Sequence, residues 1–218
     1  MSNSFPLITA QMLTLSHFTG GIAQTNGWLL RLADQAIAID APEGMSVWLS
    51  TQGVKLNALL LTHQHFDHVL DAAAIADSHA CPVIAFAPYS PDLTLERLFG
   101  ISAGISFSVP PFTVTDLVTE SSTLDLLGTS WSVLHVPGHS PDSICFHSPA
   151  TGHLFGGDVL FLDGIGRTDF PGGSTRTLLS GIQNKILTLP DKTQVHPGHG
   201  PSTTIARERL QNPFLLDD

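Results

Sequence analysis

Four potential metal ligands lie close together in residues 62–68, whose sequence is THQHFDH. They directly follow a run of apolar residues, which we expect to form a strand buried on both faces. His63 and His65 are two residues apart and point the same way from an extended segment, whereas Asp67 and His68 belong to the first turn of the next helix. Imidazoles and a carboxylate, with no thiolate among them, suit zinc, iron or manganese. An ordinary polar helix start capped by Asp67 would not need three histidines.

Three further candidate ligands each follow an expected strand. His139 lies in a turn of sequence VPGHS, Asp158 follows two glycines, and His199 lies in a turn of sequence HPGHG. Each signal is weak alone, because glycine, proline and aspartate are ordinary turn residues. Functional side chains are nevertheless often placed on loops that a rigid scaffold holds. The two similar turns therefore indicate that each must hold an imidazole in a tight loop.

Short apolar runs bounded by glycine, proline and aspartate predict a chain rich in strands. We expect strands over residues 12–18, 28–32, 35–39, 57–61, 82–86, 113–118, 130–136, 143–147, 154–155 and 193–196. We expect helices over residues 43–52, 67–79, 175–189 and 205–211. Residues 87–111 contain four prolines and are expected to form a long loop. The chain shows no linker, short repeat or low-complexity segment, so residues 1–218 are predicted to form a single domain.

The composition excludes several classes of protein. Of the 218 residues, 42% are apolar and 13% are charged, which excludes a disordered chain and a coiled coil. A formal net charge of −10 disfavours nucleic acid as a partner, because a phosphate backbone would be repelled. No apolar run approaches the roughly 20 residues of a membrane helix, and residues 1–12 lack the features of a secretory signal. We therefore expect a small-molecule substrate, with neither nucleic acid nor a membrane as a partner.

The cysteine content favours a reducing compartment. Cys81 and Cys145 are the two cysteines, and both lie in apolar strand contexts, so we interpret them as core residues. Two cysteines provide no disulfide framework, which makes a cytoplasmic location the expectation.

Taken together, His-x-His-x-Asp-His followed by a single His, an Asp and a His, each after a strand, resembles the metallo-β-lactamase superfamily of hydrolases. The resemblance covers essentially the whole chain. It implies the α/β (α+β) class and a four-layer αββα sandwich, with two divalent metal ions between the tops of two sheets. Zinc is the first choice for these ions, with iron or manganese as alternatives. The resemblance also implies a metal ligand for each of the seven positions: for the first ion His63, His65 and His139, for the second Asp67, His68 and His199, and Asp158 as the bridging carboxylate.

Within that superfamily, residues 156–161, 164–172 and 210–215 resemble the short, single-domain bacterial branch of the glyoxalase II-like group. This resemblance implies hydrolysis of thioesters such as S-lactoylglutathione by a metal-bridging hydroxide, with Asp67 as a catalytic residue that orients it. The sequence departs from full-length glyoxalase II, since only residues 200–218 follow the last histidine and the chain has three lysines and one tyrosine. The glutathione site of that group is therefore incomplete here. Further departures, which could reshape the rim of the site, fall on Leu70, Asp71 and Asp142.

Other activities remain alternatives on the same site. A mononuclear iron persulfide dioxygenase would use His63, His139 and Asp158, a set of two histidines and one carboxylate. A lactonase or a β-lactamase-like hydrolase is a further alternative, and a non-catalytic scaffold is disfavoured because no ligand is missing. Three other features allow two interpretations each. Asp40 is either an acceptor behind a ligand imidazole or a turn residue, Arg167 and Asp169 either anchor substrate or pair with each other, and residues 98–112 form either a pocket wall or a subunit contact.

Overall fold

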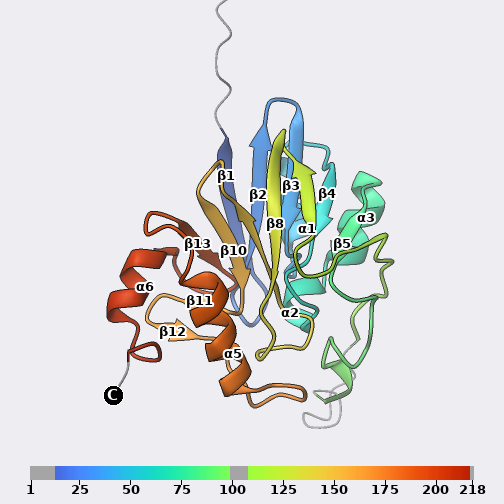
Figure 1. Cartoon of the computed structure of the whole chain (residues 1–218). Helices are drawn as coiled ribbons and strands as arrows, with labels where there is room; N and C mark the ends of the chain where they lie inside the picture. Colours follow the sequence, from blue (N-terminus) through green and yellow to red (C-terminus); the bar gives the residue numbers. More distant parts are fainter. Residues whose placement is uncertain (1–12, 99–107, 217–218) are drawn as a thin grey trace, which may run out of the picture.

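Two six-stranded sheets lie face to face and carry helices on their outer sides (Figure 1). The computed structural model describes residues 13–98 and 108–216. In spatial order, the strands of the first sheet are β1 (Thr14–Gly20), β2 (Thr25–Leu32), β3 (Gln35–Ile39), β4 (Ala58–Leu60), β5 (Val83–Ala85) and β6 (Asp116–Leu117). Those of the second sheet are β14 (Thr203–Thr204), β13 (Gln194–Pro197), β10 (His153–Gly157), β9 (Ile144–Ser148), β8 (Thr129–His135) and β7 (Thr123–Leu126).

The helices and one small ribbon complete the described elements. The first sheet packs against α1 (Met45–Thr51), α2 (Phe66–Val69) and α3 (Ala72–His79). The second packs against α5 (Thr175–Gly181), the π-helix η1 (Ile182–Ile186) and α6 (Ile205–Gln211). A two-stranded ribbon joins β11 (Leu160–Phe161) to β12 (Gly164–Ile165).

The alternation of side chains along β3 separates two of the cores. Ile37 and Ile39 face the second sheet, whereas Ala36 and Ala38 face the helices. Successive side chains of a strand point to opposite faces, so a strand buried on both sides is apolar throughout. Full burial of each isoleucine stabilises the fold by about 1.5–3 kcal/mol. The small alanines leave room for the helices to approach.

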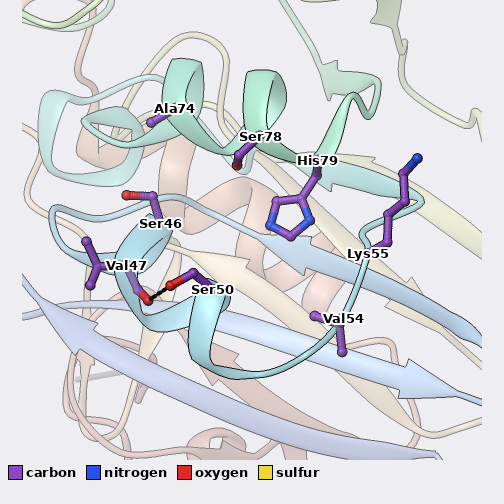
Figure 2. A pocket seen from close by; sticks show the side chains of 8 residues that line it. All are labelled: Ser46, Val47, Ser50, Val54, Lys55, Ala74, Ser78 and His79. Carbon is purple, nitrogen blue, oxygen red and sulfur yellow. Dashed lines mark hydrogen bonds between the residues drawn. The ribbon is translucent and has the colours of Figure 1, made fainter.

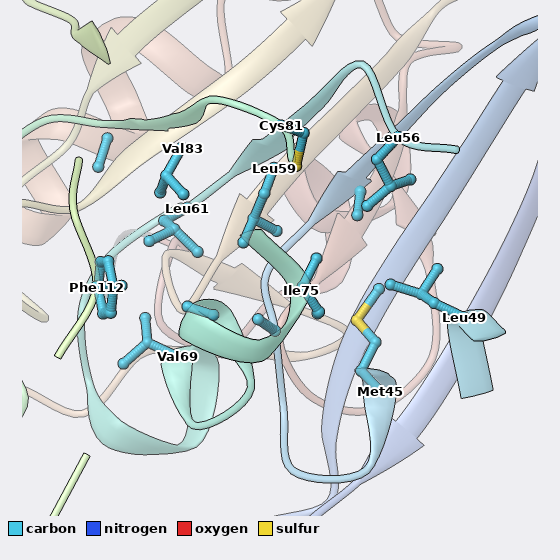
Figure 3. Close-up of a cluster of buried hydrophobic side chains, with 14 of the residues drawn as sticks. Met45, Leu49, Leu56, Leu59, Leu61, Val69, Ile75, Cys81, Val83 and Phe112 are labelled. Carbon is cyan, nitrogen blue, oxygen red and sulfur yellow. The ribbon is translucent and has the colours of Figure 1, made fainter. Parts of the chain in front are cut away.

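Three separate cores hold the four layers together. The core between the first sheet and its helices contains Met45 and Leu49 from α1, Ile75 from α3 and Leu59 from β4 (Figure 3). The core between the sheets is built around two large aromatic side chains, Trp131 and Phe155, both fully buried. The third core joins the second sheet to α5, η1 and α6. The order helix, sheet, sheet, helix confirms the expected αββα sandwich.

Several expected elements differ in extent from those observed. The helix expected over residues 67–79 is two helices, because the chain turns at Asp71, whose carboxylate accepts hydrogen bonds from the backbone and hydroxyl of Ser46. The helix expected over residues 175–189 changes to π-helical geometry at Ile182. The sequence analysis did not predict β7, β11, β12 or β14, which have two to four residues each.

Some expectations fall wholly or partly outside the described residues. Residues 1–12, where a secretory signal was excluded, lie outside them, as do residues 99–107 of the expected long loop. The two roles predicted for residues 98–112 therefore stay predictions. Within the described ranges, no helix is both long and apolar enough to cross a membrane.

A cavity of about 580 Å³ lies between α1 and α3 on the outer helical layer (Figure 2). Serine hydroxyls line it together with Lys55 and His79. Its described lining includes none of the candidate ligands. The chemistry predicted from the sequence therefore lies elsewhere, at the ends of the strands.

Candidate metal centre

The candidate ligands lie on loops, or at the start of helix α2, that follow strands running in the same direction. β3 and β4 are parallel, as are β10 and β13, and β8 runs with β10 because both are antiparallel to β9. Backbone hydrogen bonds join these loops across the sheets, from Ile144 to the Thr62 carbonyl over 2.8 Å and from Asn26 to the Gly198 carbonyl over 2.7 Å. The carboxyl ends of strands from both sheets therefore meet at one place.

All seven candidate ligands are brought together there. One group contains His63, His65 and His139, whose ring nitrogens lie within 4.8 Å of one another. Their ring centroids are 4.6 Å apart for the first two, and 4.9 and 4.4 Å from the third. As expected, the first two histidines leave an extended segment on the same side.

A second group with the same spacing contains Asp67, His68 and His199. The first two residues come from the single turn of α2, as the sequence predicted. A carboxylate oxygen of Asp67 lies 3.6 Å from Nε2 of His68 and 3.3 Å from Nε2 of His199. His199 completes the group from the loop after β13.

Asp158 lies between the two groups. Its Oδ1 is 3.2 Å from Nε2 of His68, and its Oδ2 is 3.3 Å from Nε2 of His199 and 3.5 Å from Nε2 of His139. The set within 4.8 Å that includes this carboxylate is completed by His63 and His68. The three residues of the dioxygenase alternative, His63, His139 and Asp158, also lie together here, since His63 shares a ligand group with each of the other two.

Several polar atoms at this point have no hydrogen-bond partner although they are buried. Within the described residues they include Nε2 of His63, His68 and His139 and Oδ1 of Asp158. A buried polar atom without a partner costs about 1–3 kcal/mol. These atoms belong to groups whose ligand atoms lie within 4.8 Å of one another without a hydrogen bond between them, which is an arrangement that a cation can complete. The donor set therefore fits divalent metal ions.

The electrostatics of the two groups differ. Burial lowers the pKa of His65 to about 3 and also lowers the pKa values of His63 and His139, so all three are neutral imidazoles at pH 7. Burial alone would also lower the pKa of His199, but hydrogen bonds to Asp158 and Asp67 raise it to about 9. The group of Asp67, His68 and His199, which lies beside the Asp158 carboxylate as well, therefore attracts positive charge strongly.

The family model of the metallo-β-lactamase superfamily matches residues 21–199. The chain belongs to the metallo-β-lactamase superfamily. Members of this superfamily bind divalent metals, and this chain is accordingly a metal-dependent hydrolase of that family.

Two relatives of known name are similar over most of their length. The chain is 39% identical over 168 residues to the hydroxyacylglutathione hydrolase GloC of Haemophilus influenzae, covering 74% of this chain and 77% of that protein. It is 35% identical over 201 residues to the probable metallo-hydrolase YqgX of Bacillus subtilis, covering 89% of this chain and 94% of that protein.

Two solved structures share the fold over their whole length. The B3 metallo-β-lactamase BLEG-1 superposes with a TM-score of 0.85 at 36% identity, covering 94% of this chain and all of the other. The di-iron-bound form of TTHA1623 superposes with a TM-score of 0.79 at 35% identity, covering 92% of this chain and all of the other.

Asp40 orients one of the candidate ligands of this metallo-β-lactamase-superfamily chain, by contacting the side of the His68 ring away from the other ligands. Its carboxylate accepts hydrogen bonds from Nδ1 of His68 over 2.9 Å and from the backbone N–H of Thr62 over 2.8 Å. Its φ of 60° places it in the left-handed region, as a turn residue. Both sequence interpretations of Asp40 therefore hold, and the turn aims the carboxylate at the ring. The hydrogen bond fixes the tautomer of His68 and leaves Nε2 free to face the centre.

A backbone carbonyl performs the same task for His139. Its Nδ1 donates to the Arg167 carbonyl over 2.8 Å. The Arg167 guanidinium forms two hydrogen bonds with Asp169, of 2.7 and 2.6 Å, and lies 4.0 Å from the centre of the Phe170 ring. The structure thus confirms the pairing of Arg167 with Asp169. The pair braces the loop that orients the histidine.

Two supporting residues were missed by the sequence analysis. Thr25 is fully buried at the start of β2, and its hydroxyl donates to Asp67 over 2.6 Å. Gly198 leaves space, since an added Cβ would lie 2.2 Å from Oδ1 of Asp158 and 2.5 Å from Cε1 of His68. The threonine has no sequence signal, because its partner is remote in the chain. The glycine could have been suspected from its place beside a candidate ligand.

A cleft of about 220 Å³ opens onto the centre. Candidate ligands form its floor, and its walls include Ala23, Phe66, Arg167 and Phe170. A small substrate can therefore reach both groups of candidate ligands from one side.

Proposed function

We propose that the chain holds two divalent metal ions, with zinc as the first choice, on the seven residues described above. His63, His65 and His139 hold the first ion, and Asp67, His68 and His199 hold the second. Asp158 serves both. The observation that carries this proposal is the set of buried ring nitrogens without hydrogen-bond partners, with a carboxylate lying between the two groups. The di-iron-bound form of TTHA1623, at 35% identity, supports two metals on a related chain.

We propose thioester hydrolysis of the hydroxyacylglutathione type as the reaction. The GloC relative, a hydroxyacylglutathione hydrolase by name, supports this substrate class. A pair of bound divalent metals supplies a hydroxide nucleophile near neutral pH and stabilises the developing oxyanion. No serine or cysteine nucleophile is needed. A thiolate leaves without prior protonation, so the site needs no general acid either.

Asp67 is the catalytic residue of this proposal. Burial opposes its ionisation, but in the protein without metal the positive charge of His68 and hydrogen bonds from His199 and Thr25 outweigh that effect and lower its pKa to about 2. Bound divalent cations would replace the protons on the two histidines and would also favour the ionised carboxylate. The carboxylate therefore stays ionised, and it accepts hydrogen bonds without donating any. It can orient the attacking water through the lone pairs that Thr25 leaves free.

Binding of the glutathione part is expected to be weak. Glutathione carries two carboxylates, each of which favours a cationic or N–H partner. Arg167 is the one lysine or arginine among the described residues that line the cleft, and Asp169 already pairs with it. This shortage of cationic partners should weaken substrate binding and so raise KM, whereas the rate of the hydrolytic step should be unaffected.

Steady-state kinetics with S-lactoylglutathione, a thioester without glutathione, a lactone and a β-lactam test this function. We expect turnover of both thioesters, a high KM for the glutathione thioester, and no turnover by Asp158→Ala. A low-micromolar KM would contradict weak glutathione binding. A fully metal-loaded enzyme that turns over neither thioester would refute the proposed reaction.

A second candidate function is β-lactam hydrolysis on the same site. It is favoured by the similarity to BLEG-1, a B3 metallo-β-lactamase by name, at 36% identity over 94% of this chain. Turnover of the β-lactam but of neither thioester would select this candidate.

A further inference from the structure

Asp142 is a buried carboxylate beside the site that has no part in the reaction proposed above. It is 3% exposed and lies on the loop that carries His139. Within the described residues it forms no ion pair with a lysine or an arginine. Burial raises the pKa of this carboxyl to about 6, although hydrogen bonds partly offset the effect. A buried charge without a cationic partner is costly, so its retention calls for a physical reason.

The contacts of Asp142 join the two loops that carry the three-histidine group, defined as His63, His65 and His139. The Ser140 hydroxyl donates to its Oδ1 over 2.5 Å. The backbone N–H of Gln64 lies close enough to the carboxylate to lower its pKa. Each of these partners is the immediate neighbour of a histidine in the group.

The two loops are also packed tightly around this carboxylate. Ser140 is 1% exposed and Gln64 is fully buried. The amide side chain of Gln64 is itself fixed, since it donates to the carbonyls of Ala87 and Pro88 over 3.0 Å each. A shift of Asp142 would therefore move backbone on both sides of the group rather than a free side chain.

We propose that Asp142 is a positioning residue. It fixes the two loops of the three-histidine group relative to each other and places a negative charge next to those loops. This inference rests on the proposed metal sites, but not on the identity of the substrate. Under this proposal, each of the two ligand groups has a buried carboxylate that orients it, Asp40 for the group with His68 and Asp142 for the three-histidine group. Asp40 contacts His68 directly, whereas Asp142 acts through the backbone of Gln64 and the hydroxyl of Ser140.

Asp142→Asn tests the proposal, because it keeps the shape and removes the charge. The control is Asp125→Asn, which removes the same charge from an exposed position on β7. Each variant is loaded with cobalt, which reports coordination through its visible spectrum, and is titrated with a chelator. We expect Asp142→Asn to lose about 10–100-fold in affinity for the ion at the three-histidine group, with a changed spectrum. The control should stay within about twofold of the wild type.

Ser140→Ala is the second variant, and it decides the outcome if Asp142→Asn fails to fold. It keeps the carboxylate but removes one of its hydrogen bonds, so we expect a smaller loss in the same direction. Affinity and spectrum like those of the wild type in the folded variants would overturn the proposal. That result would leave the proposed function intact, because the wild type would still bind two ions. Failure of the wild type to bind divalent metal would instead refute the proposed function itself.

Discussion

The Asp40 carboxylate accepts a hydrogen bond from Nδ1 of His68 over 2.9 Å, and both side chains are buried. The two residues are 28 positions apart: Asp40 directly follows β3, and His68 lies in α2, which follows the neighbouring parallel strand β4. The contact orients one ring and places a negative charge behind it. The same carboxylate holds Thr62, the residue before the first candidate ligand.

Removal of the Asp40 carboxylate should weaken metal binding and activity without abolishing them. We expect Asp40→Ala to reduce metal affinity or activity by about 10–100-fold, because a residue behind a ligand typically contributes that much. Asp158→Ala should leave no measurable activity, since both groups of candidate ligands lose a shared carboxylate. Metal content and kcat/KM of the two variants check this order. Equal loss of activity in both, with metal still bound to Asp40→Ala, would contradict the roles assigned here.

Two divalent metal ions per chain are expected after loading. The protein is treated with a chelator, reloaded with excess zinc or iron, desalted and submitted to elemental analysis. The metal-free form should unfold at a lower temperature, because an ion that binds only the folded state stabilises it. A single tightly held iron with no second ion, together with oxygen uptake, would favour the dioxygenase alternative.

Thr25→Val should slow the reaction, because the variant keeps the shape of the side chain but removes the hydroxyl that donates to Asp67. A hydrogen bond to a charged group contributes about 1.5–3 kcal/mol, which corresponds to roughly a 10–100-fold loss in kcat. The matched control is Thr19→Val on the same hairpin, whose hydroxyl donates to Asn26 instead. Steady-state kinetics on both variants should show a large effect only for Thr25→Val. Equal effects would assign the loss to the hairpin as a whole.

His196→Phe should make stability less sensitive to acid. Burial, with smaller effects from neighbouring histidines, lowers the pKa of His196 to about 3, and its ring stacks 4.7 Å from that of Phe155. Between pH 6.5 and pH 3 the unfolded chain binds a proton at this residue and the folded chain does not, so stability falls as the pH falls. From pH 8 to pH 5 this difference amounts to about 2 kcal/mol for the wild type and is absent in the variant.

Urea unfolding of the metal-free proteins at both pH values measures this effect. The variant should be less stable than the wild type at pH 8, because His153 and Ser202 lose their hydrogen-bond partner. The gap between the two proteins should narrow by about 2 kcal/mol at pH 5. A gap that stays constant would show that His196 does not contribute to the acid sensitivity.

Short-range patterns in the sequence were enough to predict much of the fold and the local chemistry. The strand over residues 35–39 and the helix over residues 205–211 have the predicted bounds, because side-chain periodicity and flanking turn residues are local properties. The spacing of His63, His65 and Asp67 is local too, and the structure places them as predicted. The short strands β7, β11, β12 and β14 show no clear period and no long apolar run, and they were missed.

Tertiary structure alone decided which partner each of these side chains has. Thr25 lies 42 residues from the carboxylate to which it donates, and the Arg167 carbonyl lies 28 residues from the ring that it orients. Asp142 was noticed in the sequence only as a departure from the family pattern, whereas the structure shows it between two loops. A hydrogen bond depends on distance and direction in space. For these residues, both are set by the order of strands within each sheet and by the packing of the loops at the strand ends, and no local pattern encodes that arrangement.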